Sequence, residues 1–498
     1  MKHRYTIKIN FKGGIISPGD LFDILVASEK AFVTSVKFGL RQQLLIDVSD
    51  EAKYILLNEL NLLNISHEID SDIYPNIISS YPAEEVFITK TWLSEGVYKD
   101  IFDGIDYQPK LKINISDSNQ SFTPLLTGNI NWVAATASPH FWHLFIRFPK
   151  TNLIVECKDL VYTNDLARIS KRLEELILDN KDKFYDNPKA DGNQLFEFLE
   201  REKYITQPAL KPAKLPYFNL PYYEGLNRYN DKYWLGLYRR DELFAIDFLK
   251  DLCQLCLNTK IGLLCSTPWK TIIVKSIEEK DRVLWNNLLA KHQINVRHAA
   301  NELNFQIEDN CDVGLNLKNY ILSHLHKEDT RTFGVCIGIK TRIKSEVFSS
   351  ILIRRKPLLS LGRFNFFYVY DILCAHNFNP NERTGFVFSS NNPKSLLVEQ
   401  LRRAIYSFHK YRQTTYNTMV DKPILIKEVK SAKLKTDFVY QCIHCLTVYD
   451  DKVGEKESGI MPGLPFQELD KSYCCSLCDT GKEQFVKVER GMLELQTI

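Results

Sequence analysis

Hydrophobic and polar positions change their period along this chain. Between residues 19 and 65, apolar residues first recur at helical spacing, then alternate with polar residues as in a pair of strands, and then return to helical spacing. The same order of helix, strand pair and helix recurs between residues 241 and 294. A change of period from about 3.6 to 2 distinguishes amphipathic helices from half-buried strands. Two copies of one supersecondary unit therefore indicate a duplicated, pseudo-twofold scaffold.

Each copy is followed by a β-rich stretch. The strand patterns after the first copy fall at residues 110–122, 130–138 and 141–149, and those after the second at 333–343, 347–355 and 364–373. Residues 205–230 are rich in proline and aromatic residues and show no period, so we expect them to connect the two halves. The pattern predicts an α+β fold.

Composition and charge narrow the class of protein. The 498 residues are 44% hydrophobic and 12% aromatic, enough for a large core divided into three or more domains. A net charge of +3 does not indicate a nucleic-acid partner. The N-terminus lacks the apolar segment of a signal peptide, and no apolar run is long enough to span a membrane. We therefore expect a cytoplasmic protein without a membrane partner.

Cysteines are concentrated at the C-terminal end. Of the 12 cysteines, five lie in the last part of the chain, and four of these form two Cys-x-x-Cys pairs: Cys442, Cys445, Cys475 and Cys478. Four thiolates presented by two tight turns suit a tetrahedral site for zinc or iron. The spacing alone predicts a metal site and leaves the identity of the metal open.

The residues around these pairs resemble rubredoxin. The resemblance is carried by "YQCIHCLTVYD" at 440–450, "GIMPGLPFQEL" at 459–469 and "YCCSLCDTGKEQF" at 473–485. The residues that match the family pattern are Tyr440, Tyr449, Asp450, Gly459, Pro462, Gly463, Phe466, Tyr473, Lys482 and Phe485. The resemblance implies a small metal-bound β domain, one iron held by the four cysteines, one-electron transfer and a redox partner protein such as a reductase. Zinc remains the alternative metal.

Four residues of this segment differ from the rubredoxin pattern, and one cysteine is additional. Leu446 and Asp479 stand where the family has glycine, and Ser476 stands where it has proline. Asp tolerates a left-handed backbone, whereas Leu adopts one only at a cost. Tyr473 replaces a tryptophan, and we expect the side chain of the additional Cys474 to point away from the metal.

The C-terminal segment is also acidic. Residues 438–490 contain nine acidic and six basic residues, a net charge of −3. This charge suits docking to a basic surface, either on another protein or on the basic remainder of the same chain. The alternative is that the charge serves solubility alone.

The N-terminal part resembles the sirohaem-dependent nitrite and sulfite reductases. The resemblance is carried by "GGIISPGDLFDIL" and "FGLRQQLLIDV", where Arg41 and Gln42 match an Arg-Gln pair of the family, and by "STPWKTIIV", with Lys270 at a position that is often basic. It covers roughly the first 430 residues and implies a duplicated ferredoxin-like body. That family binds a four-iron cluster beside sirohaem through Cys-x5-Cys and Cys-x3-Cys. No such spacing occurs here, so we expect a body without the cluster.

Four basic residues of the body are candidates for a pocket that binds a tetrapyrrole or a small oxyanion: Arg41, Lys270, Arg297 and His298. The alternative for each is a solvated or ion-paired residue of the scaffold.

Together, these patterns predict the following organisation. Ferredoxin-like half-domains occupy 1–80 and 231–310, β-rich α+β domains occupy 81–230 and 311–420, and a basic linker at 421–437 leads to a rubredoxin-like domain at 438–490. The predicted function is electron transfer to or from a partner reductase, with a role in nitrite or nitrate assimilation as the hypothesis. The alternatives are a sirohaem- or tetrapyrrole-binding reductase fed by its own rubredoxin tail, and a binding or scaffold protein with a structural zinc.

Overall fold

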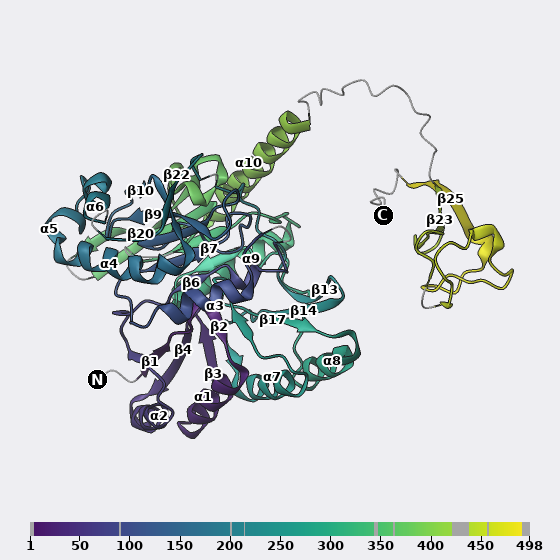
Figure 1. Cartoon of the computed structure of the whole chain (residues 1–498), viewed down its shortest axis with the longest axis horizontal. Helices are drawn as coiled ribbons and strands as arrows, with labels where there is room; N and C mark the ends of the chain where they lie inside the picture. Colours follow the sequence, from purple (N-terminus) through teal and green to yellow (C-terminus); the bar gives the residue numbers. More distant parts are fainter. Residues whose placement is uncertain are drawn as a thin grey trace. The chain divides into compact units, whose positions relative to one another are not determined.

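The computed structural model describes residues 4–88, 91–199, 202–213, 215–342, 347–361, 364–420, 438–455 and 458–490. The chain forms two compact units, Met1–Thr414 and Thr415–Ile498 (Figure 1). The predicted basic linker at 421–437 lies outside the described residues.

The two copies of the repeat contain the predicted helices and strands in the predicted order. The first copy consists of β1 (Arg4–Ile9), β2 (Ile15–Ile16), α1 (Pro18–Lys30), β3 (Ser35–Phe38), β4 (Leu44–Ser49), α2 (Asp50–Leu62) and β5 (Glu68–Ile69). The second consists of β13 (Gly225–Tyr229), β14 (Lys232–Leu237), β15 (Phe244–Ala245), α7 (Ile246–Asn258), β16 (Leu264–Ser266), β17 (Ile272–Ile277) and α8 (Arg282–Lys291). Helix α1 begins where the sequence predicts, because the Ser17 hydroxyl accepts from Asp20 N and Pro18 starts the first turn.

The two copies exchange strands. β2 of the first copy pairs with β16 of the second, and β15 of the second pairs with β3 of the first. The resulting sheets have the orders β15-β3-β4-β1-β5 and β13-β14-β17-β16-β2. Helices α1 and α7 pack against each other below these sheets and share one hydrophobic core (Figure 1). Each copy therefore depends on the other for a strand and for helix burial.

The β-rich stretches are also related to each other. The first contains β6 (Ile78–Ser79), α3 (Glu95–Gly104), β7 (Ile113–Ser116), β8 (Ile130–Ala134), β9 (Phe141–Arg147), β10 (Ile154–Glu156), β11 (Asp159–Tyr162), α4 (Leu166–Asp179), α5 (Lys181–Phe184), α6 (Gly192–Leu199) and β12 (Thr206–Pro208). The second contains β18 (Phe305–Ile307), α9 (Asp312–Lys327), β19 (Ile337–Lys340), β20 (Ile351–Leu361), β21 (Phe364–Ala375), β22 (Gly385–Asn392) and α10 (Lys394–Val420).

The strand pairing follows the same rule in both stretches. In β6-β7-β8-β9 and in β18-β19-β20-β21, the first two pairings are parallel and the third is antiparallel. The duplication seen in the helix and strand patterns thus extends through the body.

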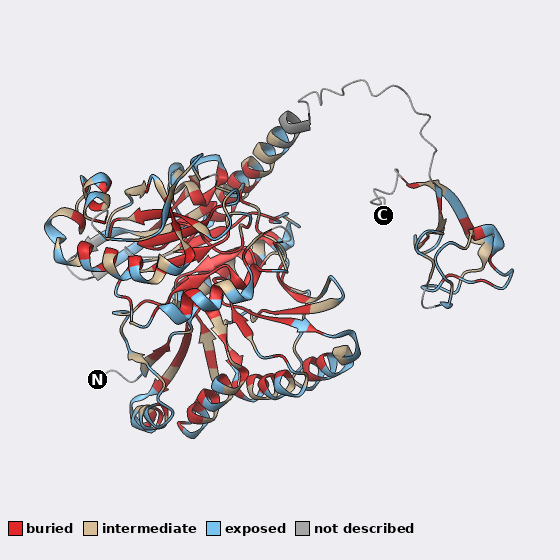
Figure 2. Cartoon of the chain, in the orientation of Figure 1, coloured by how far each residue is buried: buried red, intermediate tan, exposed pale blue. Residues whose placement is uncertain are grey.

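Burial follows this arrangement. Figure 2 shows buried residues concentrated on the strands of the body, with helices exposing their outer faces. Trp132, Trp142 and Trp285 are among the largest fully buried side chains. Six of the seven body cysteines are buried: Cys157, Cys253, Cys256, Cys265, Cys336 and Cys374. Among the described residues, no helix combines the length and the apolar character that crossing a bilayer would require.

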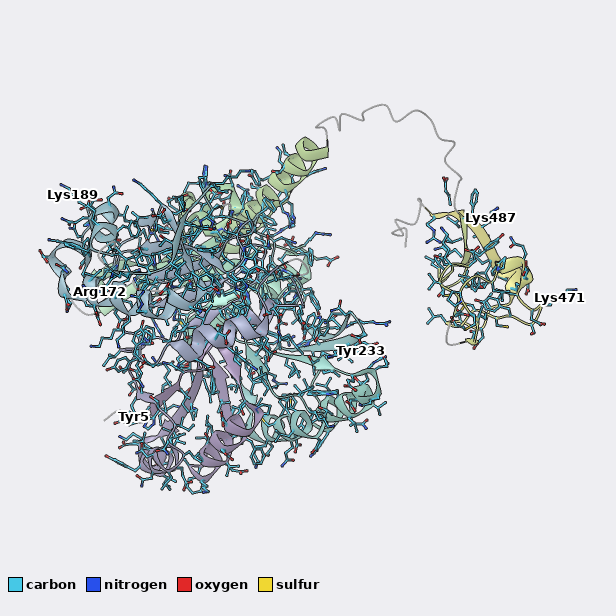
Figure 3. The ribbon with its side chains drawn as sticks, viewed as in Figure 1. Tyr5, Arg172, Lys189, Tyr233, Lys471 and Lys487 are labelled. Atoms are coloured by element: carbon cyan, nitrogen blue, oxygen red, sulfur yellow. The ribbon has the colours of Figure 1, made fainter. Side chains whose placement is uncertain are left out.

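The C-terminal unit is a small β domain, as predicted. β23 (Phe438–Cys442) lies between β24 (Val448–Tyr449) and β25 (Phe485–Glu489) in an antiparallel sheet. The rings of Tyr440 and Phe466 stack with their centroids 4.1 Å apart. Further rings from Tyr449, Tyr473 and Phe485 surround Phe466. Lys471 and Lys487 project from the outside of this domain (Figure 3).

Candidate metal centre and basic cavity

Two loops with the same backbone geometry present the four predicted cysteine ligands. In the first loop, Leu446 N donates to Cys442 O and Cys442 N donates to Thr447 O. In the second, Asp479 N donates to Cys475 O, and Cys475 N donates to Thr480 O. Both loops reverse direction through a left-handed residue, Leu446 with φ 61° and Asp479 with φ 56°.

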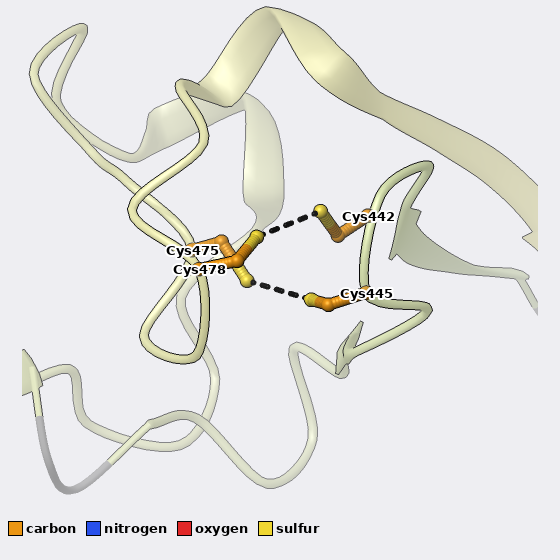
Figure 4. A group of neighbouring side chains, drawn as sticks. All are labelled: Cys442, Cys445, Cys475 and Cys478. Carbon is orange, nitrogen blue, oxygen red and sulfur yellow. Dashed lines mark hydrogen bonds between the residues drawn. The ribbon is translucent and has the colours of Figure 1, made fainter.

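The sulfur atoms of the four cysteines converge. They all lie within 4.8 Å of one another, and Figure 4 shows Cys442 and Cys445 facing Cys475 and Cys478. The Sγ–Sγ distance is 3.4 Å for Cys445 and Cys475 and 3.7 Å for Cys442 and Cys478. This donor set fits a single tetrahedral iron or zinc ion. Because Cys442 and Cys475 are buried while Cys478 is exposed and Cys445 half-buried, one side of the site faces solvent.

Local hydrogen bonds influence the charge of these thiols. The pKa of Cys442 lies below its ordinary value because the backbone N–H of Cys445 points at its sulfur. Hydrogen bonding to Thr447 lowers the pKa of Cys445 to about 6. Burial instead raises the pKa of Cys475 to about 11. A metal ion therefore has to displace the proton of Cys475, whereas the first loop favours the thiolate.

The departures from the rubredoxin pattern fit around this site. The Ser476 hydroxyl donates to Glu455 Oε1 at 2.6 Å. Tyr473 is 9% exposed and belongs to the aromatic core. Cys474 is exposed, and its thiol donates to Ser472 O at 3.4 Å, so it stands outside the group of four as expected.

The C-terminal unit thus belongs to the class of small β domains with a four-cysteine metal site. The sequence model of the rubredoxin family matches residues 439–485. Rubredoxin-1 of Chlorobaculum tepidum is 34% identical over 62 residues, which are 12% of this chain and 90% of that protein. The chain belongs to the rubredoxin family through this domain, and its four-cysteine site is of the iron-binding, electron-transfer type.

Two longer rubredoxins also match a short part of this chain. High molecular weight rubredoxin of Moorella thermoacetica is 43% identical over 49 residues, which are 10% of this chain and 21% of that protein. Rubredoxin-2 of Ectopseudomonas oleovorans is 35% identical over 48 residues, 10% of this chain and 28% of that protein. The chain therefore spans about a fifth of the length of the first relative and just over a quarter of the second.

The comparison of folds concerns most of the chain. The structure of the NirA protein of Mycobacterium tuberculosis superposes with a TM-score of 0.61 at 14% identity, covering 83% of this chain and 84% of that one. This likeness confirms, at the level of the fold, the resemblance predicted for the N-terminal part.

A large basic cavity opens in the body. Its volume is about 980 Å³, and basic side chains from both halves of the body line it: Lys8, Arg41, Lys112, Arg147, Lys150, Lys340 and Arg342. Four carboxylates also line it: Asp70, Asp72, Glu308 and Asp309. Arg147 donates to the carbonyls of Gly128 and Thr127, and the charge of Lys340 interacts with the carboxylate of Glu308. The excess of cations suits a ligand that carries several negative charges.

Arg41 is the predicted candidate that lines this cavity. It is 4% exposed, and its guanidinium donates to Asn76 O at 2.6 and 2.9 Å and to Ile113 O at 3.1 Å. Burial lowers its pKa to about 10, so it remains charged at neutral pH. These bonds between the first repeat and the first β-rich stretch fix the guanidinium at the cavity wall.

Lys270 does not line the cavity, although its ammonium lies 3.5 Å from the carboxylate of Asp309, which does. It is buried, and its ammonium donates to Glu242 Oε2 at 2.8 Å and to Glu308 O at 3.1 Å. The backbone of Lys270 is left-handed, with a φ of 58°, and so is that of Gln42, with a φ of 63°. In each case the backbone N–H donates to the carbonyl oxygen of the residue three positions earlier in the chain. This correspondence aligns Lys270 with Gln42 and Trp269 with Arg41.

The position equivalent to Arg41 is therefore filled by an aromatic side chain. Trp269 is 4% exposed and donates from Nε1 to Phe122 O at 2.7 Å within the aromatic core. The two copies of the repeat therefore differ at this position: in the first copy it lines an open, basic cavity, and in the second it lies in a packed aromatic core.

Arg297 and His298 do not line the large cavity either. Arg297 donates to Leu226 O at 2.7 Å and lies over Gly225, where an added Cβ would come within 2.7 Å of its side chain. His298 Nδ1 lies 2.8 Å from Glu224 Oε1. The structure therefore does not bring the four candidate residues of the body together around one space.

Sequence reasoning missed most cations of the cavity. They come from five separate parts of the chain, and only two pairs are close in sequence, Arg147 with Lys150 and Lys340 with Arg342. Neither pair by itself indicates that the five parts meet. A weak signal exists, since Arg147 is the last residue of β9 and Lys340 is the last residue of β19. A basic residue at a strand end becomes informative only when it is known which strand ends meet.

Proposed function

We propose that this protein is a one-electron carrier that holds one iron through Cys442, Cys445, Cys475 and Cys478 and serves a reductase. The convergence of four cysteine sulfurs within 4.8 Å, in a domain of the rubredoxin family, is the observation that supports this proposal. An iron bound to four thiolates alternates between the ferric and ferrous states without gaining or losing a ligand. Because four protein ligands complete the site, it offers no position for a substrate.

The residues of the chain have separate tasks in this carrier. Cys442 and Cys475 anchor the site in the aromatic core, and the half-buried Cys445 and exposed Cys478 provide the side through which an electron leaves or enters. The backbone N–H groups directed at the sulfurs stabilise their negative charge and adjust the reduction potential. The proposal places the carrier in the cytoplasm, a reducing compartment in which cysteine thiols stay reduced.

The test is a metal analysis combined with a visible spectrum of the full chain expressed in iron-replete medium. The expected result is one iron per chain and thiolate-to-iron charge-transfer bands that bleach on reduction and return on oxidation. One zinc per chain and a colourless protein would instead support the structural-zinc alternative. A chain that takes up iron without a reversible one-electron couple would contradict the proposal.

A second function is favoured by the basic cavity. We propose as the runner-up that the body binds a polyanionic cofactor of the tetrapyrrole type and acts as a reductase that receives electrons from a rubredoxin domain. Seven cations line a cavity of about 980 Å³, and the fold is that of the NirA protein. The nitrite or nitrate hypothesis belongs here, and it is supported by the resemblance and the fold alone. Retention of a Soret band through purification, and reoxidation of the reduced chain by nitrite, are the expected results.

Two substitutions test the cavity against a matched control. The variants Lys340→Met and Arg41→Gln each remove one cation from the cavity wall. Each is expected to weaken retention of an anionic tetrapyrrole at least about tenfold, because one charge-assisted contact contributes about 1.5–3 kcal/mol. Arg297→Met removes an exposed cation outside the cavity and should leave retention unchanged. Equal retention by all three variants, measured by Soret absorbance after gel filtration, would contradict this binding site.

A further inference from the structure

Leu446 combines a strained backbone with an exposed side chain. Its φ of 61° is left-handed, a conformation in which the Cβ of an L-residue crowds the following carbonyl. Its side chain is 63% exposed, so burial within this chain does not offset the strain. Asp479, the equivalent residue of the second loop, has the same conformation but belongs to a residue type that tolerates it. Strain held at an exposed apolar position suggests a role outside the domain.

The surroundings of Leu446 identify that role. Leu446 follows the half-buried Cys445, Leu477 precedes the exposed Cys478 and is 71% exposed, and Ile443 is 47% exposed. We call Ile443, Leu446 and Leu477 the apolar rim. Each member adjoins a cysteine whose sulfur lies within 4.8 Å of the other three sulfurs. The apolar rim therefore borders the four-cysteine site on the side that faces solvent.

The rim lies on an acidic domain. Residues 438–490 carry a net charge of −3, and the exposed Asp479 directly follows Cys478. A complementary partner would present an apolar centre bordered by cations. Such a partner would bury the apolar rim and bring its own redox group close to Cys445 and Cys478.

We propose that Leu446 is a contact residue for this partner, a redox protein with an apolar patch bordered by basic residues, and that the strain of its backbone is retained because the exposed leucine strengthens docking. This inference rests on the proposed electron-carrier function and names the chemistry of the partner. In the transfer step, one electron leaves the ferrous site and reduces the oxidised redox group of the partner, and no bond or proton is exchanged.

The experiment uses the full iron-loaded chain and ferric cytochrome c, a cationic haem protein, as the probe. Oxidation of the reduced chain is followed by stopped flow at several ionic strengths, and affinity is measured by titration. The variants are Leu446→Gly and Leu446→Asn, both compatible with a left-handed backbone. Leu62→Asn is the matched control, because Leu62 is 78% exposed at the end of α2 in the body.

Both Leu446 variants are expected to resist chemical unfolding at least as well as the wild type, and to bind and reduce cytochrome c about tenfold less well because a leucine contact is lost. Their salt dependence should match the wild type, since no charge changes. Leu62→Asn should behave as the wild type. This pattern would separate a docking role from a structural one, since stability and transfer would change in opposite directions.

Three outcomes would overturn the inference. Leu446→Gly with an unchanged rate and affinity would show that the residue makes no contact with the partner. A concentration-dependent dimer of the wild type that Leu446→Gly abolishes would make a second copy the occupant of the rim. A chain that takes up no iron would end the proposed function itself, whereas an iron-loaded chain with an unaffected variant would contradict docking alone.

Discussion

At the scale of single residues, the four-cysteine site depends on backbone conformations as much as on sulfur atoms. The two loops share one hydrogen-bond pattern, and each needs a left-handed residue directly after its second cysteine. Glycine would satisfy that need without strain, and this chain uses Leu446 and Asp479 instead. We therefore expect that replacing Leu446 by glycine increases the stability of the C-terminal domain.

Leu446→Gly is expected to stabilise the C-terminal domain by about 1 kcal/mol. The change removes the left-handed strain of about 1–2 kcal/mol and adds the smaller entropy cost of glycine in the unfolded chain. Guanidinium unfolding followed by loss of the visible absorption measures the effect. The control is Leu477→Gly, because Leu477 is similarly exposed and lies in the other loop without a positive φ. A stabilisation by both substitutions would contradict the strain argument.

At the scale of elements, pairs of strands from distant parts of the chain hold the body together. The exchange of β2 and β15 between the copies joins residues near the N-terminus to residues in the middle of the chain. In the second β-rich stretch, Asp371 of β21 links three strands. Its carboxylate lies 2.7 Å from Arg354 Nη2 of β20 and accepts from Asn391 N of β22 at 2.9 Å.

Asp371→Asn is expected to destabilise the body by about 2 kcal/mol at pH 7, because charge-assisted hydrogen bonds to a 1% exposed carboxylate are lost. Burial acts to raise the pKa of Asp371, but the N–H of Asn391 and the cations Arg354 and Lys356 hold it below its ordinary value. A depressed pKa stabilises the fold above the unfolded-state pKa of about 3.9, and this contribution is lost as pH falls through the folded-state value.

The difference between wild type and Asp371→Asn should therefore be constant from about pH 5 to pH 8 and shrink below about pH 4. Urea unfolding followed by tryptophan fluorescence measures it, since all six tryptophans lie in the body. Asp329→Asn, at an exposed position, is the matched control. A difference that grows on acidification would contradict the assigned direction of the pKa shift.

At the scale of the whole molecule, the two units have separate cores. The C-terminal unit has a small aromatic core that includes two of its cysteines, Cys442 and Cys475, whereas the body has larger cores of its own. A domain of this size depends on its metal for stability. Removal of the metal should therefore destabilise the C-terminal unit and leave the stability of the body unchanged.

Removal of the metal by a chelator at pH 7 is expected to unfold the C-terminal unit and leave the body folded. Limited proteolysis should then cleave the C-terminal unit rapidly, while the tryptophan fluorescence of the body stays unchanged. Readdition of iron should restore protection. A loss of body fluorescence in parallel with the metal would show that the two units do not unfold independently.

The functional site of the C-terminal unit could be predicted from the sequence, whereas the cavity of the body could not, and the difference has a physical reason. A metal site built from two tight turns is a local feature, so the spacing of Cys442, Cys445, Cys475 and Cys478 was enough to locate it. In the same way, the presence of Leu446 at a position where the family has glycine was enough to locate the strained, left-handed backbone. The period of apolar residues also determined the duplicated helices and strands, because burial imposes that period within each element.

Only the tertiary structure decided which distant residues meet. Three features depend on contacts between different segments of the chain: the alignment of Trp269 with Arg41, the ion pairing of Lys270 with Glu242, and the assembly of the basic cavity from cations of five segments. Such contacts follow from strand pairing and helix packing across the whole body, and no local pattern of residues records them. The sequence therefore determined the site that lies within one short segment, and the fold decided the site that many segments share.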